Sequence, residues 1–242
     1  MRLVGERRAL AAAVLAFFML QFLISGLLID GPFKGMLIGL GLVYGAGFFG
    51  VVAGYFWARW YALGLSFSGV AMAVMTIIRG GEVNTAILVI GITHAIIGLG
   101  LIGTDAAAFY DGRRDWRERW KMDENAVNRL GKAVTRAGAS LPYLVIAGLA
   151  PKEGSGEALT ALALVLGVVG FAGLVRMRTW SLLALGATAA LLAGTLTGLD
   201  GWPPLSFDGL PVLATPAIAG ALVLSALLPF AHPVIKYLRV RG

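Results

Sequence analysis

The sequence predicts an all-α polytopic membrane protein with eight transmembrane helices, arranged as two parallel four-helix repeats joined by a cytoplasmic amphipathic helical segment. Three observations predict this class. The chain is 58% hydrophobic and only 14% charged, with a mean hydropathy of +0.83, which excludes an ordinary soluble domain. Eight apolar runs are long enough to cross a hydrocarbon core, which takes about 20 residues. The charged residues cluster between these runs, as membrane topology requires.

The predicted spans divide evenly between the two halves of the chain. The first four cover residues 9–29, 35–56, 60–78 and 85–103, and the second four cover residues 133–150, 158–175, 180–199 and 210–231. The run at 9–29 exceeds the roughly 7 to 15 apolar residues of a signal peptide, so we expect an uncleaved first helix. These boundaries predict three regions: residues 1–104, a linker at 105–132, and residues 133–242.

The positions of lysine and arginine predict the orientation, because positive side chains accumulate on the cytoplasmic side. With the N-terminus inside, only Lys34, Arg79 and Lys152 of the 20 basic residues fall on the outer side. We therefore expect both termini to be cytoplasmic. The predicted location is a bacterial inner membrane.

Similar short motifs suggest that the halves are copies. Residues 53–59 and 172–178 align at an offset of 119, which also pairs Pro32 with Pro151 and Thr76 with Thr195. Because each unit has an even number of spans, the copies would be parallel, related by a pseudo-two-fold axis along the membrane normal. The alternative is coincidence between apolar segments of low complexity.

The second predicted helix carries small residues at helical spacing. A stripe on one face is formed by Gly35, Gly39, Ala46, Gly50 and Gly54. Such a stripe lets another helix approach closely, since dispersion contacts drive helix association in lipid. The alternative is a smooth face that slides or lines a pathway.

Polar residues within the predicted spans are few. His94 is the one titratable side chain near the middle of a span, and Gln21 is the other strongly polar group at depth. His94 can be interpreted as a haem ligand, a proton relay or a substrate contact, or as a neutral imidazole that bonds a neighbouring helix. The second histidine, His232, lies near the end of the last span, on the order of 10 Å or more away in depth, so a haem shared by both is not expected.

Other catalytic chemistry has no support in the sequence. The chain has no cysteine, which excludes disulfides, thiolate metal sites and thiol catalysis. Its histidines and carboxylates lack the spacing of a metal site, and its serines lack the context of an activated nucleophile. All 13 carboxylates lie in predicted loops or termini, which counts against a proton-driven carrier. We therefore predict no cofactor and no metal, and an enzyme is the least favoured class.

The segment 105–136 holds 14 of the 33 charged residues. Read as a helix, it has an amphipathic pattern, with an apolar stripe formed by Phe109, Trp116, Trp120, Val127, Leu130 and Val134 and a basic remainder that includes Arg113, Arg114 and Arg117. Asp111 and Asp123 are candidate N-caps, so two helical pieces should meet near residues 122–125, and the second should continue into the fifth span.

This segment could contact anionic lipid, dock a partner or cap the bundle, or simply connect the halves. Six acidic residues are interspersed with eight basic ones, and nucleic-acid binding is therefore not expected. A second candidate contact surface is the loop at 200–209, where Trp202 and Phe207 could bind a partner or rest on lipid headgroups.

These observations favour a non-catalytic integral membrane protein, a structural or accessory subunit of a larger assembly, with membrane lipids and other membrane subunits as partners. The alternative is a small-molecule or lipid transporter with its site between the repeats. In that case the available polar residues are His94, Gln21, Thr76 and Thr195.

Overall fold

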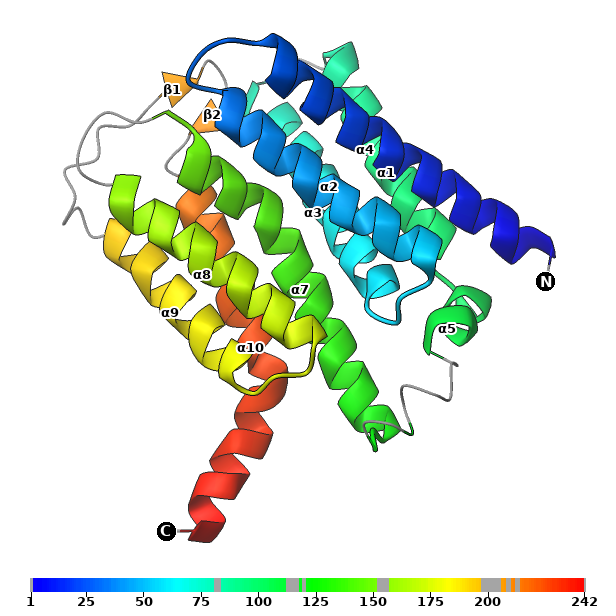
Figure 1. The fold of residues 1–242 in the computed structure, drawn as a ribbon, viewed down its shortest axis with the longest axis vertical. Helices are drawn as coiled ribbons and strands as arrows, with labels where there is room; N and C mark the ends of the chain where they lie inside the picture. Colours follow the sequence, from blue (N-terminus) through cyan, green and yellow to red (C-terminus); the bar gives the residue numbers. More distant parts are fainter. Residues whose placement is uncertain are drawn as a thin grey trace.

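The computed structural model describes residues 2–80, 84–111, 118, 121–151, 157–196, 206–207, 210–211 and 214–241. This part of the chain is helical almost throughout (Figure 1). The first half contains α1 (Arg2–Leu28), α2 (Lys34–Ala53), α3 (Ala58–Gly80), α4 (Thr85–Leu101) and the short α5 (Thr104–Asp111). The second half contains α7 (Glu124–Leu149), α8 (Glu157–Val175), α9 (Trp180–Leu196) and α10 (Ala214–Arg241). A pair of two-residue strands precedes α10, with β1 (Ser206–Phe207) antiparallel to β2 (Leu210–Pro211).

The helices identify an integral membrane protein. Four are long and apolar enough to cross a membrane: Gly5–Leu28, Lys34–Ala53, Ala58–Ile78 and Ala158–Val175. A fifth appears if α4 and α5 count as one span, although a bend of 72° separates them. Gly103 permits this bend, because its φ of 124° is disfavoured for other residues. The apolar parts of α9 and α10, Trp180–Thr195 and Thr215–Ala231, are shorter.

Each half forms a ring of four helices. In the first, α1 packs on α2, α2 on α3, α3 on α4 and α4 back on α1; α7, α8, α9 and α10 make the same sequence of neighbours. The rings meet where α7 packs against α3 and α2. If a two-fold axis related the halves, α1 would pack against α8 and α9 as α7 packs against α2 and α3. In the described part of the chain, α1 makes no comparable contact with α8 or α9 (Figure 1). The two halves therefore lie side by side, joined through α7.

The centre of the molecule is α7, which contacts helices of both halves. Asp123 caps it, accepting a 2.6 Å hydrogen bond from the Ala126 amide, as the sequence predicted. From there the helix runs unbroken to Leu149, through the boundary placed at residue 132. Its inner positions are buried from Val127 onward. It carries Arg129, Lys132 and Arg136, and it is not among the four helices named above as long and apolar enough to cross a membrane.

The small residues of α2 pack in two directions, and the predicted single stripe is wrong. A β-carbon at Gly41 would lie 2.6 Å from Leu23 Cγ of α1, whereas one at Gly39 would lie 2.8 Å from Val145 Cγ1 of α7. Gly35 has no such neighbour within 4 Å, and Ala46 is exposed. The glycines thus allow α1 and α7 to approach α2 from different sides.

The turns after α2 and α8 have the same geometry, but not at the predicted offset. Gly54 ends α2 in the left-handed region, and Met177 takes this conformation after α8. The matching bonds are Tyr55 N to Gly50 O, at 3.1 Å, and Arg178 N to Gly173 O, at 2.8 Å. Gly54 therefore corresponds to Met177, so the offset here is 123 (177 − 54), not 119.

The second predicted piece of the charged segment is α7, whereas most of the first lies outside the described residues; Asp111 is the last residue of α5 and is no N-cap. Of the predicted apolar stripe, Val127, Leu130 and Val134 are buried in α7, and Phe109 of α5 packs on the core. Trp116 and Trp120, with Arg113, Arg114 and Arg117, lie outside the described residues.

One end of the bundle gathers the starts of α1, α3, α7 and α9 with the ends of α2, α4 and α8 (Figure 1). It carries Arg7, Arg8, Arg59, Arg136 and Arg178, and we call it the charged end.

Candidate functional site

His94 lies inside the first ring and is 1% exposed. Its Nδ1 is 2.8 Å from the Ile90 carbonyl oxygen, and its Nε2 is 2.6 Å from the Tyr44 hydroxyl. A carbonyl only accepts, so Nδ1 carries the hydrogen, and Nε2 accepts from Tyr44. The imidazole is then neutral with both nitrogens bonded, which is the form that an apolar interior favours.

Apolar groups fill the space around His94. The Phe18 ring lies 4.5 Å from the imidazole centroid to centroid, and Phe22 packs against Tyr44 at 5.5 Å. On the α3 side, a methyl group at Gly69 would overlap the imidazole ring. The Ser66 hydroxyl donates to the His94 carbonyl at 2.6 Å. In this arrangement His94 has no ring nitrogen left for a metal ion or a substrate.

The other polar residues predicted at depth do not join His94. The Thr76 hydroxyl donates to Met72 O within α3 at 2.8 Å, and that of Thr195 donates to Leu192 O within α9 at 2.7 Å. Gln21 is exposed on the outer side of α1, with no hydrogen bond from its side chain to the described part of the chain. The four residues therefore occupy separate places.

The junction between the rings, where the transporter hypothesis places a site, is closely packed around Gly64 and Gly138. A methyl group at Gly64 of α3 would overlap the Thr135 carbonyl oxygen of α7 and lie 2.8 Å from the Ala139 amide nitrogen. At Gly138 of α7 it would lie 2.8 Å from Tyr61 Cδ2. Direct backbone contact leaves little room here.

The loop candidates are only partly described. Trp202 lies outside the described residues. Phe207 is in β1, with its backbone paired to Leu210, and its side chain is not described.

Tyrosine hydroxyls form a second set of polar contacts that the sequence did not indicate. Each donates to a carbonyl of a neighbouring helix: Tyr61 to Val43 at 2.8 Å, Tyr110 to Val51 at 3.1 Å and Tyr143 to Ser68 at 3.2 Å. The available signal was only that a tyrosine in an apolar environment needs a partner for its hydroxyl. The partners are 18 to 75 residues away in the sequence and follow from tertiary packing.

Arginines at the charged end bind carbonyl oxygens at helix ends. Arg7 donates to Leu99 O and, at 2.7 Å, to Ile102 O, while Arg59 donates to Leu101 O at 3.0 Å. The last carbonyls of a helix lack helical partners and carry partial negative charge. These arginines therefore tie α1 and α3 to the end of α4.

Arg8 makes a similar connection to α2. It donates to Val52 O at 2.8 Å, and its guanidinium carbon lies 4.7 Å from the centroid of the Phe109 ring of α5. This cation–π contact helps to hold α5 against the bundle.

Arg136 satisfies a carbonyl that a proline leaves open. Pro229 has no amide hydrogen, so the Ser225 carbonyl four residues earlier in α10 lacks its helical donor. The Arg136 Nη1 group donates to this oxygen at 2.7 Å. The charged side chain of α7 thereby replaces the hydrogen bond that Pro229 removes from α10.

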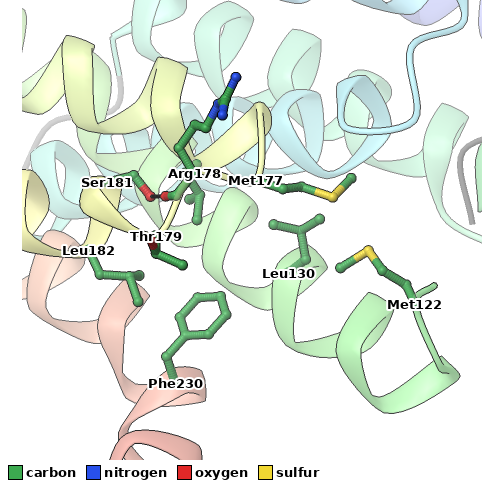
Figure 2. Close-up of a pocket in the computed structure, with 9 residues that line it drawn as sticks. Met122, Leu130, Met177, Arg178, Thr179, Ser181, Leu182 and Phe230 are labelled. Atoms are coloured by element: carbon green, nitrogen blue, oxygen red, sulfur yellow. Dashed lines mark hydrogen bonds between the residues drawn. The ribbon is translucent and has the colours of Figure 1, made fainter. Parts of the chain in front are cut away.

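An apolar cavity of about 220 Å³ lies at the charged end of the second ring (Figure 2). Met122, Leu130, Met177 and Phe230 face one another across it. Ser181 bonds the Arg178 carbonyl at 2.5 Å, and the Arg178 guanidinium points away from the cavity. A lining with so few polar groups can hold an apolar chain but offers no catalytic group.

The described residues contain no group of three or more His, Cys, Asp or Glu side chains able to hold a metal ion. Comparison with known proteins gives no match to a family model, a curated protein or a solved structure.

Proposed function

We propose that this chain is a non-catalytic integral membrane protein that acts as a structural or accessory subunit of a larger membrane assembly. Gln21 is the observation that carries the proposal. It lies on the outer face of α1 with exposed Phe17, Leu20, Ile24 and Leu28. This side-chain amide lies about 7 Å along α1 from the midpoint of its span. A primary amide in hydrocarbon is costly without a hydrogen-bond partner, and a helix of another subunit would supply one.

The environment of His94 supports the non-catalytic part of the proposal. A transporter or enzyme that used this residue would need a path to it, yet its ring nitrogens are bonded to Tyr44 and Ile90 and the ring is buried. Neither the 220 Å³ cavity nor the basic pocket discussed below includes His94. The transporter alternative is further weakened by the contacts at Gly64 and Gly138, which pack α3 directly against α7 in the middle of the junction, whereas the basic pocket lies at its charged end.

We further propose that all eight long helices cross a bacterial inner membrane as two parallel four-helix units, with both termini and the charged end in the cytoplasm. The matching order of neighbours in the two rings supports a duplication. Arg136 donates a hydrogen bond to Ser225 O of α10 within the bundle, which supports placing α7 in the membrane despite its polarity. The linker would then lie at the cytoplasmic surface.

The test is purification from the native membrane in a gentle detergent, comparing the wild-type chain with Gln21→Leu. We expect a stoichiometric membrane partner with the wild type and about fivefold less of it with Gln21→Leu, since an interhelical hydrogen bond contributes roughly 0.6 to 2 kcal/mol. Ile24→Leu, one turn along the same face, keeps the amide and should retain the partner. Isolation of the wild type alone, together with specific stabilisation by a small solute, would support a transporter instead.

A further inference from the structure

A second cavity at the charged end is basic. It has a volume of about 320 Å³, within the range of small-ligand sites, and lies between the start of α3 and the first half of α7. From α3 it is lined by Arg59, Trp60 and Leu63, and from α7 by Asn128, Gly131, Lys132, Thr135 and Arg136. Three of these eight described residues are cationic and none is acidic.

Contacts outside the cavity fix two of the three cations. Arg59 Nε is bonded to Leu101 O at 3.0 Å and Arg136 Nη1 to Ser225 O at 2.7 Å. The acceptor of Arg136 is a neutral carbonyl, so this bond orients the guanidinium without cancelling its charge. Lys132 is exposed and adds a mobile ammonium. The nearest acidic residue before Lys132 on α7 is Glu124, about 12 Å along the helix axis.

The packing of the wall makes the cavity a preformed site. Trp60 is 6% exposed, and a β-carbon at Gly131 would lie 2.7 Å from Trp60 Cε2. This contact sets the spacing of α3 and α7 at the base of the cavity. The Thr135 hydroxyl donates to Gly131 O at 2.9 Å, so the neutral donor available to a ligand is the Asn128 amide.

The cavity lies at the charged end, which the proposed topology puts at the membrane surface. Arg59 is the second residue of α3, directly before its apolar stretch, and Arg136 is the last charged residue of α7 before an apolar stretch to Leu149. Both helices become apolar beyond the cavity, so in the topology proposed above, on which this inference rests, the cavity lies near the boundary between hydrocarbon and headgroups. Basic pockets between transmembrane helices at this depth suit anionic phospholipids.

We propose that this basic pocket binds the phosphodiester of an anionic glycerophospholipid from the leaflet at the charged end. The guanidinium groups of Arg59 and Arg136 would bind phosphate oxygens, Lys132 would add charge, and the acyl chains would run along the apolar surface towards Leu63. A phosphatidylcholine headgroup carries a compensating cation and should bind more weakly.

The experiment measures binding of phosphatidylglycerol to the purified full chain in neutral detergent by native mass spectrometry, with phosphatidylcholine and inorganic phosphate as separate additions. We expect Lys132→Gln to weaken phosphatidylglycerol binding about fivefold, and Arg59→Gln with Lys132→Gln about 25-fold, at roughly fivefold for each basic residue. Arg129→Gln is the matched control, because Arg129 is an exposed cation of α7 outside the pocket, and it should bind like the wild type.

Three results would overturn the proposal: equal affinity of wild type and Lys132→Gln, equal affinity for phosphatidylglycerol and phosphatidylcholine, or full displacement of phosphatidylglycerol by millimolar inorganic phosphate. The last would identify a site for a free anion. Thermal unfolding of each variant without added lipid separates loss of the site from loss of the fold, and Lys132→Gln should unfold at the wild-type temperature because its side chain is exposed.

Discussion

Replacing Gly64 by alanine is expected to lower the free energy of unfolding by about 2 kcal/mol or more, the range for overpacking a tight interior. The added methyl group would overlap the Thr135 carbonyl oxygen and lie 2.8 Å from the Ala139 amide nitrogen. Both atoms belong to the backbone of α7, which cannot rotate away as a side chain can. The two rings would have to separate, and unfolding by titration with a denaturing detergent in mixed micelles measures the loss.

The matched control for this prediction is Gly35→Ala in α2. A β-carbon at Gly35 has no contact within 4 Å, and alanine has a helix propensity about 1 kcal/mol more favourable than glycine. The control should therefore be neutral or slightly stabilising. If Gly64→Ala behaves like Gly35→Ala, then α3 and α7 do not approach as closely as described.

Replacing Tyr44 by phenylalanine is expected to cost about 1 to 3 kcal/mol, because Nε2 of the buried His94 would lose its donor while the aromatic packing remained. In a His94→Leu background the same substitution should cost much less, since the acceptor is already absent. This double-mutant cycle measures the coupling between the two side chains.

Tyr55 provides the control for Tyr44, because it lies in the α2–α3 turn and is 55% exposed. Tyr55→Phe should leave the free energy of unfolding within about 0.5 kcal/mol of the wild type. An equal cost of Tyr44→Phe in the wild-type and His94→Leu backgrounds would contradict the proposed bond and reopen a functional role for His94.

The positions of the long helices could be predicted from local sequence. Runs of about 20 apolar residues separated by short polar stretches identify each helix without tertiary information. Asp123 was recognisable as an N-cap because the cap depends on residues within three positions. The extension of α7 through Arg129 and Arg136 also followed, since the amphipathic period continues across them.

Contacts between helices could not be predicted in the same way. His94 was identifiable as a buried polar group, but its partner Tyr44 lies 50 residues earlier, and nothing local selects that tyrosine. Gly39 and Ala46 belong to one predicted small-residue stripe, yet Gly39 packs against Val145 of α7 and Ala46 is exposed. The alignment at an offset of 119 matched letters, whereas the turn is set by which residue takes the left-handed conformation, and that residue is Met177.

The most direct test of the eight-span topology uses the absence of cysteine from the chain, because single cysteines can be introduced and labelled with a membrane-impermeant thiol reagent. Asn125→Cys, at the start of α7, and Tyr55→Cys should react only in inside-out vesicles. Asp30→Cys, after α1, and Ala158→Cys, in the first turn of α8, should react in intact cells. Labelling of Asn125→Cys and Ala158→Cys from the same side would show that α7 does not cross the membrane, and would contradict the arrangement of two four-helix units.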